Sequence, residues 1–466
     1  MAWTFSGVFL DDLAGERVVA GTGDAEELPG RFALAGLVDA HAHPTVAVDE
    51  RGPYLSDGEY GTARLEEYAA AGVTVIRDAG GRSQLTLGFA GTAAAGRPVV
   101  TAAGRFLAPA NRYFPRMHSP VAPDELALAI QAEVAAGAAW VKIIGDFPEW
   151  AEGGPVPQST AATYDLETLR SAVDAAHAAG ARVAVHSNLP DSGLAGIGAD
   201  SIEHGTALGH SELEALGVRG GAWTPTLCAV LHGRDSSDPA VRSRTDELRE
   251  RLRDCLPYAV AHGVRVLAGT DVVGTIADEI ALLAEHGLTA AQALAAAGSA
   301  ARDFLGIHPE GDIVTYDDDP LEDPRALARP VAVVVRGVRV RLRLPAGERS
   351  GQPEPWEHAV VEAGHGGDPV TGKREHEEAG PVADAAMGAQ VGPERWLAVG
   401  SRRYELASAR AEDAGEEAGH GITALPFEGH RRHGQEDVVG QQGHHRVEIG
   451  GLVCADELGH ERILGR

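Results

Sequence analysis

Apolar residues between positions 35 and 305 follow one repeating pattern. An alanine-rich amphipathic stretch ends at a glycine, and a short run of apolar, largely β-branched residues comes next; the pattern occurs at residues 68–78, 134–144, 177–186 and 261–269. A glycine at this point suits the left-handed residue that ends a helix, and a continuous apolar run suits a buried parallel strand. The pattern therefore predicts helices that alternate with parallel strands.

Eight apolar runs are candidates for these strands. They centre on residues 37–38, 73–78, 99–102, 140–144, 182–186, 201–204, 222–224 and 266–271. Eight strands over roughly 270 residues fit a closed (β/α)8 barrel of the TIM type, so we predict an α/β barrel over residues 35–305. A doubly wound open sheet is the alternative, but no glycine-rich phosphate-binding motif follows the first run.

The segments outside residues 35–305 have different patterns. Residues 4–32, 313–316 and 331–342 have no helical periodicity, and the last of these alternates Val with Arg. We predict that the two flanks, 1–34 and 306–345, pair into a small β-sandwich. Residues 346–466 are rich in Gly, Glu and His without a sustained period, which is typical of a largely disordered tail. A metal-scavenging role for the tail histidines is an open alternative.

Charge and composition narrow the class of partner. The net charge of −28 repels nucleic acid and anionic membranes, and no apolar run reaches the roughly 20 residues that span a bilayer. Cys228, Cys255 and Cys454 lack metal-type spacing and fit reduced thiols, and the first ten residues lack a basic start. We expect a cytoplasmic protein that binds a small-molecule substrate and neither nucleic acid nor membrane; a homo-oligomer is compatible with the sequence.

Polar residues occur at the ends of five of the predicted strands. His41 and His43 end the first run, and residues at positions i and i+2 of a strand point to the same side. The C-terminal strand ends of a barrel converge on one pocket. Imidazole nitrogens and carboxylate oxygens suit Zn²⁺ or a similar ion, so we predict a metal site there. The six candidate ligands are His41, His43, Lys142, His186, His204 and Asp271.

Lys142 is distinctive because it is the one lysine among residues 1–372. A codon preference for arginine explains the many arginines but not this exception. An amine has chemistry that a guanidinium lacks, which makes Lys142 a candidate for function. A salt-bridged or snorkelling lysine is the alternative.

Several motifs around these residues occur in a characteristic order. They are GLVDAHAH at 36–43, RDAGG at 77–81, VKI at 141–143, VH at 185–186, IEHG at 202–205, GTD at 269–271 and SAAR at 299–302. In these motifs the chain resembles the amidohydrolase superfamily over about residues 5–345. The nearest branch is the imidazolonepropionase-like hydrolases, and within it the prolidase-like members that carry a carboxylated lysine.

The resemblance implies a binuclear site with two divalent ions per chain, for which we expect zinc. His41, His43 and Asp271 would hold one ion, and His186 and His204 the other. Lys142, carboxylated by CO₂ to a carbamate, would bridge them together with a hydroxide. The hydroxide would attack the carbonyl of an amide C–N bond, and Asp271 would pass a proton to the leaving amine. Dipeptides or N-acyl amino acids are the expected substrates, with cyclic amides second.

Other activities of the superfamily stay open. Its deaminases place a glutamate shortly after the fifth-strand histidine, whereas residues 187–190 here contain no carboxylate. A mononuclear cyclic-amide hydrolase with an unmodified Lys142 and a catalytically inactive scaffold are further alternatives, although none of the ligands is missing.

The loop at residues 111–118 supplies candidate substrate-binding residues near the barrel mouth: Arg112, Tyr113, Arg116 and His118. Either arginine could clamp a substrate carboxylate with two parallel hydrogen bonds. A solvated loop charge is the alternative.

Overall fold

The chain divides into two units, residues 1–374 and 375–466. The computed structural model describes residues 2–10, 20–21, 23–92, 94–152, 154–190, 192–232, 234 and 238–342. Within 375–466 it describes the backbone of two antiparallel strand pairs, β24 (Leu397–Val399) with β25 (Arg402–Tyr404) and β26 (Val453–Ala455) with β27 (Glu461–Ile463). The rest of the predicted disordered tail lies outside the described residues.

The glycines that follow the helices adopt the expected backbone conformation. Gly72, Gly137, Gly180 and Gly263 have φ angles of 84°, 106°, 86° and 83°, and each separates a helix from a strand or apolar run. Only glycine enters this left-handed region without steric cost. The repeating sequence pattern therefore corresponds to the local structure that it predicts.

The predicted strands form two parallel sheets. The order is β10-β9-β6 in one sheet and β11-β12-β17-β18-β19-β20 in the other. Hydrogen bonds from Ala40 N to Ala268 O (2.8 Å) and from Asp271 N to His41 O (2.7 Å) connect β6 with the segment after β20. The strands are β6 (Leu37–Ala42), β9 (Val73–Asp78), β10 (Val99–Ala102), β11 (Phe106–Leu107), β12 (Trp140–Ile144), β17 (Arg182–Ser187), β18 (Ser201–His204), β19 (Ala222–Thr224) and β20 (Arg265–Val266).

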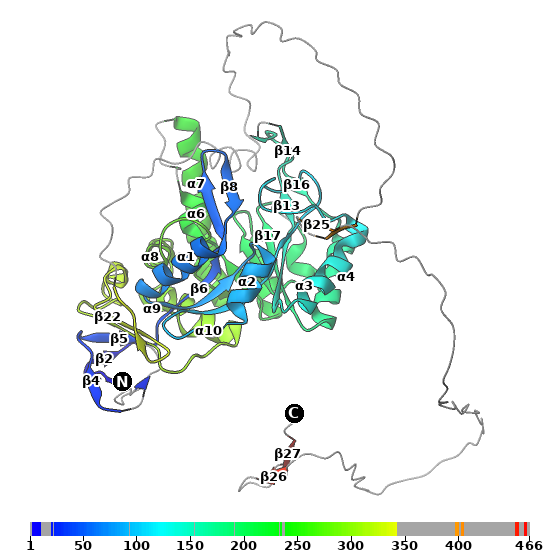
Figure 1. The fold of residues 1–466 in the computed structure, drawn as a ribbon. Helices are drawn as coiled ribbons and strands as arrows, with labels where there is room; N and C mark the ends of the chain where they lie inside the picture. The colour runs from blue at the N-terminus through cyan, green and yellow to red at the C-terminus, as the bar shows by residue number, and fades with distance from the viewer. Residues whose placement is uncertain are drawn as a thin grey trace, which may run out of the picture. The chain divides into compact units, whose positions relative to one another are not determined.

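Helices follow most of these strands and pack against the sheets (Figure 1). They are α1 (Gly58–Ala70), α2 (Ser83–Ala90), α3 (Leu126–Ala135), α4 (Leu166–Ala178), α5 (His210–Val218), α6 (Leu227–Leu231), α7 (Pro239–Ala261), α8 (Ile276–Glu285), α9 (Ala290–Ala296) and α10 (Ser299–Leu305), with short 3₁₀ turns at Pro123–Glu125, Leu194–Gly196 and Pro324–Ala328. Among the described residues, no helix combines the length and apolar character that crossing a bilayer demands.

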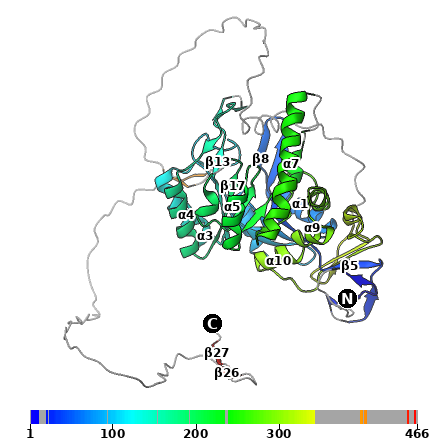
Figure 2. The same ribbon diagram turned by 180° about the vertical axis from the view of Figure 1, so that it is seen from behind.

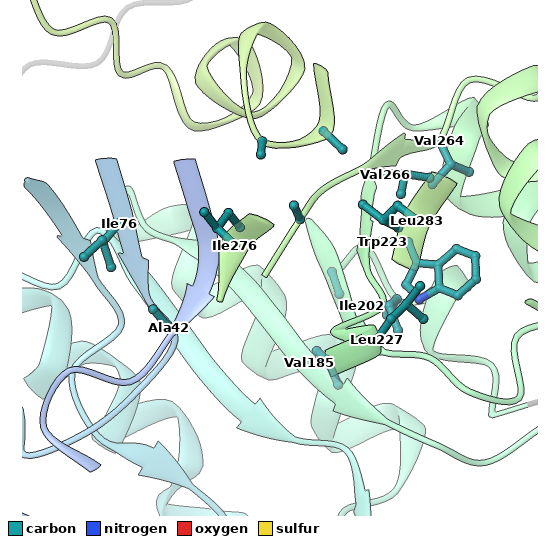
Figure 3. Packing of buried hydrophobic residues seen from close by; sticks show 14 of the residues in the cluster. Ala42, Ile76, Val185, Ile202, Trp223, Leu227, Val264, Val266, Ile276 and Leu283 are labelled. Atoms are coloured by element: carbon teal, nitrogen blue, oxygen red, sulfur yellow. The ribbon is translucent and has the colours of Figure 1, made fainter. Parts of the chain in front are cut away.

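The main apolar core lies between the strands and the helices that follow them. Side chains from the strands, such as Val185, Ile202 and Trp223, meet helix residues such as Leu227 and Leu283 (Figure 3). All five are almost completely buried. Each buried side chain of this size contributes about 1.5–3 kcal/mol through the hydrophobic effect. This packing holds the strand ends, and the polar side chains on them, in fixed positions.

The two flanks of the predicted barrel share a β-sheet. β5 pairs antiparallel with β21, and the five-stranded order is β2-β5-β21-β22-β23, beside a three-stranded sheet β3-β1-β4. Trp3, Phe5 and Val334 pack in the core of this unit. The strands are β1 (Ala2–Thr4), β2 (Val8–Phe9), β3 (Ala20–Gly21), β4 (Ala25–Glu27), β5 (Phe32–Leu34), β21 (Ile313–Tyr316), β22 (Ala332–Val335) and β23 (Val338–Arg339).

Short antiparallel pairs follow two of the parallel strands. The β7–β8 hairpin comes after β6, and the β13–β16 pair comes after β12; in both views they lie on the same side of the sheets as one end of α7 (Figures 1 and 2). This is the side of the C-terminal strand ends. The strands are β7 (Val46–Asp49), β8 (Gly52–Leu55), β13 (Asp146–Phe147), β14 (Trp150–Ala151), β15 (Gly154–Pro155) and β16 (Ala161–Ala162).

Candidate metal centre

All six candidate ligands line one cavity of about 160 Å³ at the C-terminal ends of the parallel strands. His41 lies on β6 and Lys142 on β12, while His186 and His204 lie near the ends of β17 and β18. His43 follows β6 and Asp271 follows β20, and the bridge between Ala42 and Asp271 brings these two segments together. The six residues are His41, His43, Lys142, His186, His204 and Asp271.

Within the cavity, three of these residues are arranged as metal ligands are. Nε2 of His43 lies 3.2 Å from Nε2 of His41 and 3.2 Å from Oδ1 of Asp271. One donor atom from each of the three residues lies within 4.8 Å of the others. The ring centroids of His186 and His204 are 4.5 Å apart, and that of His204 is 5.0 Å from that of His41. The histidines therefore form one contiguous group.

Two residues of this group have an unusual backbone conformation. His204 and Asp271 have φ angles of 61° and 59°, in the left-handed region that residues with a side chain rarely adopt. Such a conformation costs about 1–3 kcal/mol and persists where the surrounding structure imposes it, often at functional sites. His204 adopts this conformation at the end of β18, and Asp271 adopts it where the chain crosses to β6. Both side chains line the cavity.

Hydrogen bonds fix the rings of three histidines. Nδ1 of His41 contacts Glu203 Oε2 at 2.5 Å, and Nδ1 of His43 contacts Gly80 O at 2.7 Å. Both partners are acceptors, so both Nδ1 atoms carry the proton. Nδ1 of His204 contacts Thr226 Oγ1 at 2.7 Å, and since that hydroxyl donates to Pro225 O, this Nδ1 also donates. Each ring keeps its Nε2 lone pair for a ligand, as metal binding requires.

Burial keeps the histidines neutral. It lowers the pKa of His204 to about 3, and it holds the pKa values of His41 and His186 well below the usual 6.5. Neighbouring positive charges, including that of Lys142, lower the last two further. The Asp271 carboxyl has a pKa below its usual range: burial acts to raise it, but the adjacent imidazole of His43, 3.2 Å away, outweighs this effect. Neutral imidazoles beside a carboxylate fit a divalent cation.

Lys142 has a buried amine that makes no hydrogen bond to the described residues. Its side chain is 1% exposed, and Nζ has no hydrogen-bond partner among the described residues. Burial lowers the pKa of this amine to about 8, so a substantial fraction is neutral near physiological pH. A partnerless buried amine is costly, and conversion to a carbamate that binds cations would satisfy it. The residue therefore fits the bridging role that the resemblance implies.

A buried ion pair between Arg77 and Glu203 contacts the His41 ring through Glu203. Nη2 of Arg77 lies 2.8 Å from both carboxylate oxygens of Glu203, and the same carboxylate accepts from His41 and from Ser201 Oγ. Both charged side chains are completely buried. Burial acts to raise the pKa of Glu203, but the charges of Arg77 and Lys142 lower it overall, so it stays ionised. A carboxylate in this position orients the imidazole and increases its basicity.

Replacing Glu203 by glutamine tests this support. The substitution leaves the buried Arg77 charge uncompensated, which costs about 3–5 kcal/mol of folding stability. It also weakens the orientation of His41, so we expect metal affinity to fall about 10- to 100-fold. Thermal unfolding and chelator competition measure the two effects, with Glu59→Gln on the exposed side of α1 as the control. Unchanged stability and affinity in the Glu203 variant would exclude the supporting role.

The predicted substrate-binding loop divides into two kinds of residue. Tyr113 lines the cavity, and its ring centroid lies 6.5 Å from that of His186. Arg116 pairs with Asp49 (2.9 and 2.5 Å), and Arg112 donates to the carbonyls of Phe147 and Ser159, both at 3.0 Å. The ring of His118 contacts the carbonyls of Phe114 and Pro109. Arg112, Arg116 and His118 are absent from the described lining of the cavity, and their substrate contacts stay a prediction.

Several residues of the site were not assigned a role from the sequence. Glu203 and Arg77 support His41, and the Asn188 amide nitrogen lies 3.3 Å from His186 Nε2. A signal was present for the first two, because a charge inside a buried apolar strand needs a partner. Arg234 also lines the cavity, but it lies after α6 in a segment that contains no motif. Its location became evident only from the fold.

Comparison with known proteins agrees with the motifs. The model of the amidohydrolase family matches residues 32–340. An uncharacterized protein of Mycobacterium tuberculosis is 32% identical over 333 residues, which cover 66% of this chain and 85% of that protein.

Two solved structures have a similar fold. A prolidase complexed with N-methylphosphonate-L-proline has a TM-score of 0.59 at 20% identity and covers 74% of this chain and 100% of its own. The ochratoxinase of A. niger has a TM-score of 0.57 at 17% identity, with 76% and 99% covered. At these identities the likeness concerns the fold alone.

Proposed function

Since this chain belongs to the amidohydrolase family, we propose that it hydrolyses the amide C–N bond of a dipeptide or an N-acyl amino acid at a binuclear metal site. One observation carries the proposal: the partnerless amine of Lys142 lines the same cavity as four neutral or lone-pair-bearing histidines and the Asp271 carboxylate. One of the similar solved structures is named a prolidase. This name supports a dipeptide or a related compound as the substrate proposed here.

The donor atoms divide between two cations. His41, His43 and Asp271 would hold one, and His186 and His204 the other, with the carbamate of Lys142 as the bridge. Carbamate formation joins the neutral Lys142 amine to CO₂ and releases one proton. Zn²⁺ suits this mixture of nitrogen and oxygen ligands. Two bound ions would polarise the substrate carbonyl and supply a hydroxide nucleophile near neutral pH.

Residues of the chain itself position and move the proton. Asp271 is ionised, and we assign it the role of accepting a proton as the nucleophile attacks and of delivering it to the leaving nitrogen. The side chain is 20% exposed towards the cavity, which lets it reach both partners. Glu203 and Arg77 keep His41 in place during this step.

The same proposal includes a closed barrel. The bridge between Ala42 and Asp271 joins β6 to the segment after β20. At the other edge, β10 pairs with β9 and β11 pairs with β12, and only residues 103–105 separate β10 from β11. Closure through these two seams supports one ring of eight strands with the ligands at its C-terminal mouth.

The pKa of Lys142 predicts how metal loading depends on pH. With a pKa of about 8, roughly 3% of the amine is neutral at pH 6.5 and roughly 75% at pH 8.5. Because only the neutral amine reacts with CO₂, metal-free protein should acquire activity about 25-fold faster at pH 8.5 when zinc is added at the same concentration of dissolved CO₂. His41, His186 and His204 have depressed pKa values and stay neutral at both pH values. Equal loading rates at the two pH values would contradict carbamate formation.

Hydrolysis of defined substrates tests the activity. We expect zinc-loaded protein to release free amino groups from members of a panel of dipeptides and N-acyl amino acids, measured with an amine-reactive dye. The Asp271→Asn variant is the negative control for contaminating peptidases. If the loaded protein cleaved no member of the panel, nor any cyclic amide, the enzymatic proposal would fail in favour of an inactive scaffold.

A further inference from the structure

A second cavity, of about 580 Å³, is lined mainly by residues of the helices α6, α7 and α8, which Figure 1 labels. Its volume lies in the range of about 300–1,000 Å³ that is usual for small-molecule sites. We propose that this cavity binds a free amino acid with an aliphatic side chain. The inference goes beyond the proposed function and does not depend on it.

His286, directly after α8, has a buried ring nitrogen without a donor. The residue is 3% exposed and lines the second cavity, and its Nε2 has no hydrogen-bond partner among the described residues. Its Nδ1 contacts Leu282 O at 2.8 Å, and because a carbonyl oxygen only accepts, Nδ1 carries the proton. Burial lowers the pKa of the ring, although the bond to Leu282 acts in the opposite direction. The ring is therefore neutral, and its Nε2 favours a ligand with a donor such as an ammonium group.

Two opposite charges line the same cavity. Glu250 and Arg253 lie three positions apart on α7, and neither forms an ion pair with another described residue. Both are exposed, so they can turn towards a ligand without loss of a buried contact. The other two carboxylates of the lining, those of Asp246 and Glu285, have arginine partners at 3.8 and 2.8 Å. Glu250 is therefore placed to accept from a ligand ammonium, and Arg253 to donate to a ligand carboxylate.

The lining favours a zwitterion over a metal ion. Among the described residues of this cavity, no three donor groups bring their ligand atoms within 4.8 Å of one another, as those of the metal cavity do. An amino acid supplies a donor for Nε2 of His286 and a counter-charge for both Glu250 and Arg253. Leu231 and Leu282 add apolar surface to the lining, which suits an aliphatic side chain.

The second cavity is distinct from the metal cavity. Cys228 and Leu231 of α6 line the second cavity, whereas Ala229 and Val230 of the same helix line the metal cavity. Within the described lining of the two cavities, His232 is the one residue that they share, and none of the six candidate metal ligands reaches the second cavity. Binding there thus uses residues that the proposed hydrolysis does not.

Calorimetric titration of the zinc-loaded protein with L-leucine tests the site. Two matched probes each lack one charge: 4-methylpentanoate has no ammonium group, and 3-methylbutylamine has no carboxylate. We expect saturable binding of L-leucine, with a Kd about 10- to 100-fold lower than that of either probe. Absence of leucine binding, as when water alone occupies the cavity, would overturn the proposal. A Kd for 3-methylbutylamine equal to that for L-leucine would do the same.

A substitution of His286 locates the ammonium group. His286→Asn keeps a donor for Leu282 O but removes the Nε2 acceptor, so the Kd for L-leucine should rise about 10- to 100-fold. His262→Asn is the matched control. His262 directly follows α7, is exposed, and contacts the carbonyl of Tyr258 through Nδ1 at 2.9 Å, so its replacement should leave the Kd unchanged. An equal Kd in His286→Asn and the wild type would contradict the assignment.

Arg253→Met tests the carboxylate independently, because this exposed side chain can be replaced without a change in the core. It should raise the Kd for L-leucine about tenfold and leave that for 3-methylbutylamine unchanged, whereas Arg242→Met, also exposed on α7, should alter neither. Asp271→Asn, in the metal cavity, should retain leucine binding. Loss of binding in Asp271→Asn with an unchanged Kd in Arg253→Met would place the amino acid at the metal cavity and overturn the inference. Because no turnover is measured, failure of the hydrolytic function would leave these results unaffected.

Discussion

Replacement of Lys142 by alanine is expected to lower kcat/KM by at least about a thousandfold, because the variant lacks the proposed carbamate that would hold both cations. The fold should survive, since Nζ makes no hydrogen bond within the described chain and its burial is unfavourable. The expected result is therefore loss of metal and activity with near-native thermal unfolding of the metal-free protein. Metal analysis, kinetics and calorimetry measure these three quantities.

Two controls make this result specific for a carbamate. Propionate or another short-chain carboxylic acid should occupy the space left in Lys142→Ala and restore part of the activity, because it supplies a carboxylate at the same place. Lys142→Arg keeps the positive charge but cannot be carboxylated, so it should stay inactive with and without propionate. Wild-type activity in either variant would exclude the bridging role.

Asp271→Asn is expected to lower the activity by a factor similar to that expected for Lys142→Ala. The substitution removes a carboxylate that both contacts His43 at 3.2 Å and carries the proton in the proposed reaction. Loss of a general acid–base group costs about 10²–10⁴-fold in rate, and loss of a metal ligand adds to it. We expect kcat to fall at least about a thousandfold on the best substrate of the panel.

A surface control and the zinc content of the variant separate loss of proton transfer from loss of metal binding. Asp317→Asn, at an exposed position after β21, should leave kcat unchanged. If Asp271→Asn retained both zinc and more than about a tenth of wild-type kcat, Asp271 could not be the proton carrier. A variant that kept zinc but lost kcat would assign the residue to proton transfer more than to metal binding.

The pattern of apolar runs predicted the strands well because each run is buried on both faces. Residues 73–78, 99–102, 140–144 and 201–204 are strands with the predicted bounds. The last run, 266–271, is different: the strand itself is only Arg265–Val266, and the remainder crosses towards β6. Gly269 explains the departure, since a Cβ there would lie 2.5 Å from that of His41. Sequence alone cannot reveal such a close approach between segments 228 positions apart.

The convergence of the candidate ligands on one cavity could be predicted from the sequence because strand ends in a parallel fold converge. His41, His186 and His204 all end buried runs, and the cavity contains all three. The positive φ angles of His204 and Asp271 were not predictable, because nothing in their own residue type requires them. They arise from the contacts around the strand ends.

The substrate side of the site was harder to infer. Arg112 and Arg116 occur in a loop near the mouth, but the partner of Arg116 is Asp49, which is 67 positions away. Local sequence gives no indication of such a pairing. Arg234 lies outside every motif, and the position of α6 brings it to the cavity. The surroundings of these arginines thus depend on tertiary contacts more than the positions of the candidate metal ligands do.

The metal content of the wild-type protein tests the binuclear site most directly. Protein prepared with zinc and bicarbonate, and freed of loosely bound ions by gel filtration, is analysed by mass spectrometry for metal per chain. A truncation to residues 1–374 serves as the control for ions that the tail histidines bind. We expect about two zinc ions per chain in both proteins, together with a mass increase of one CO₂ on Lys142. One ion per chain without the added mass, or none, would contradict the bridged site.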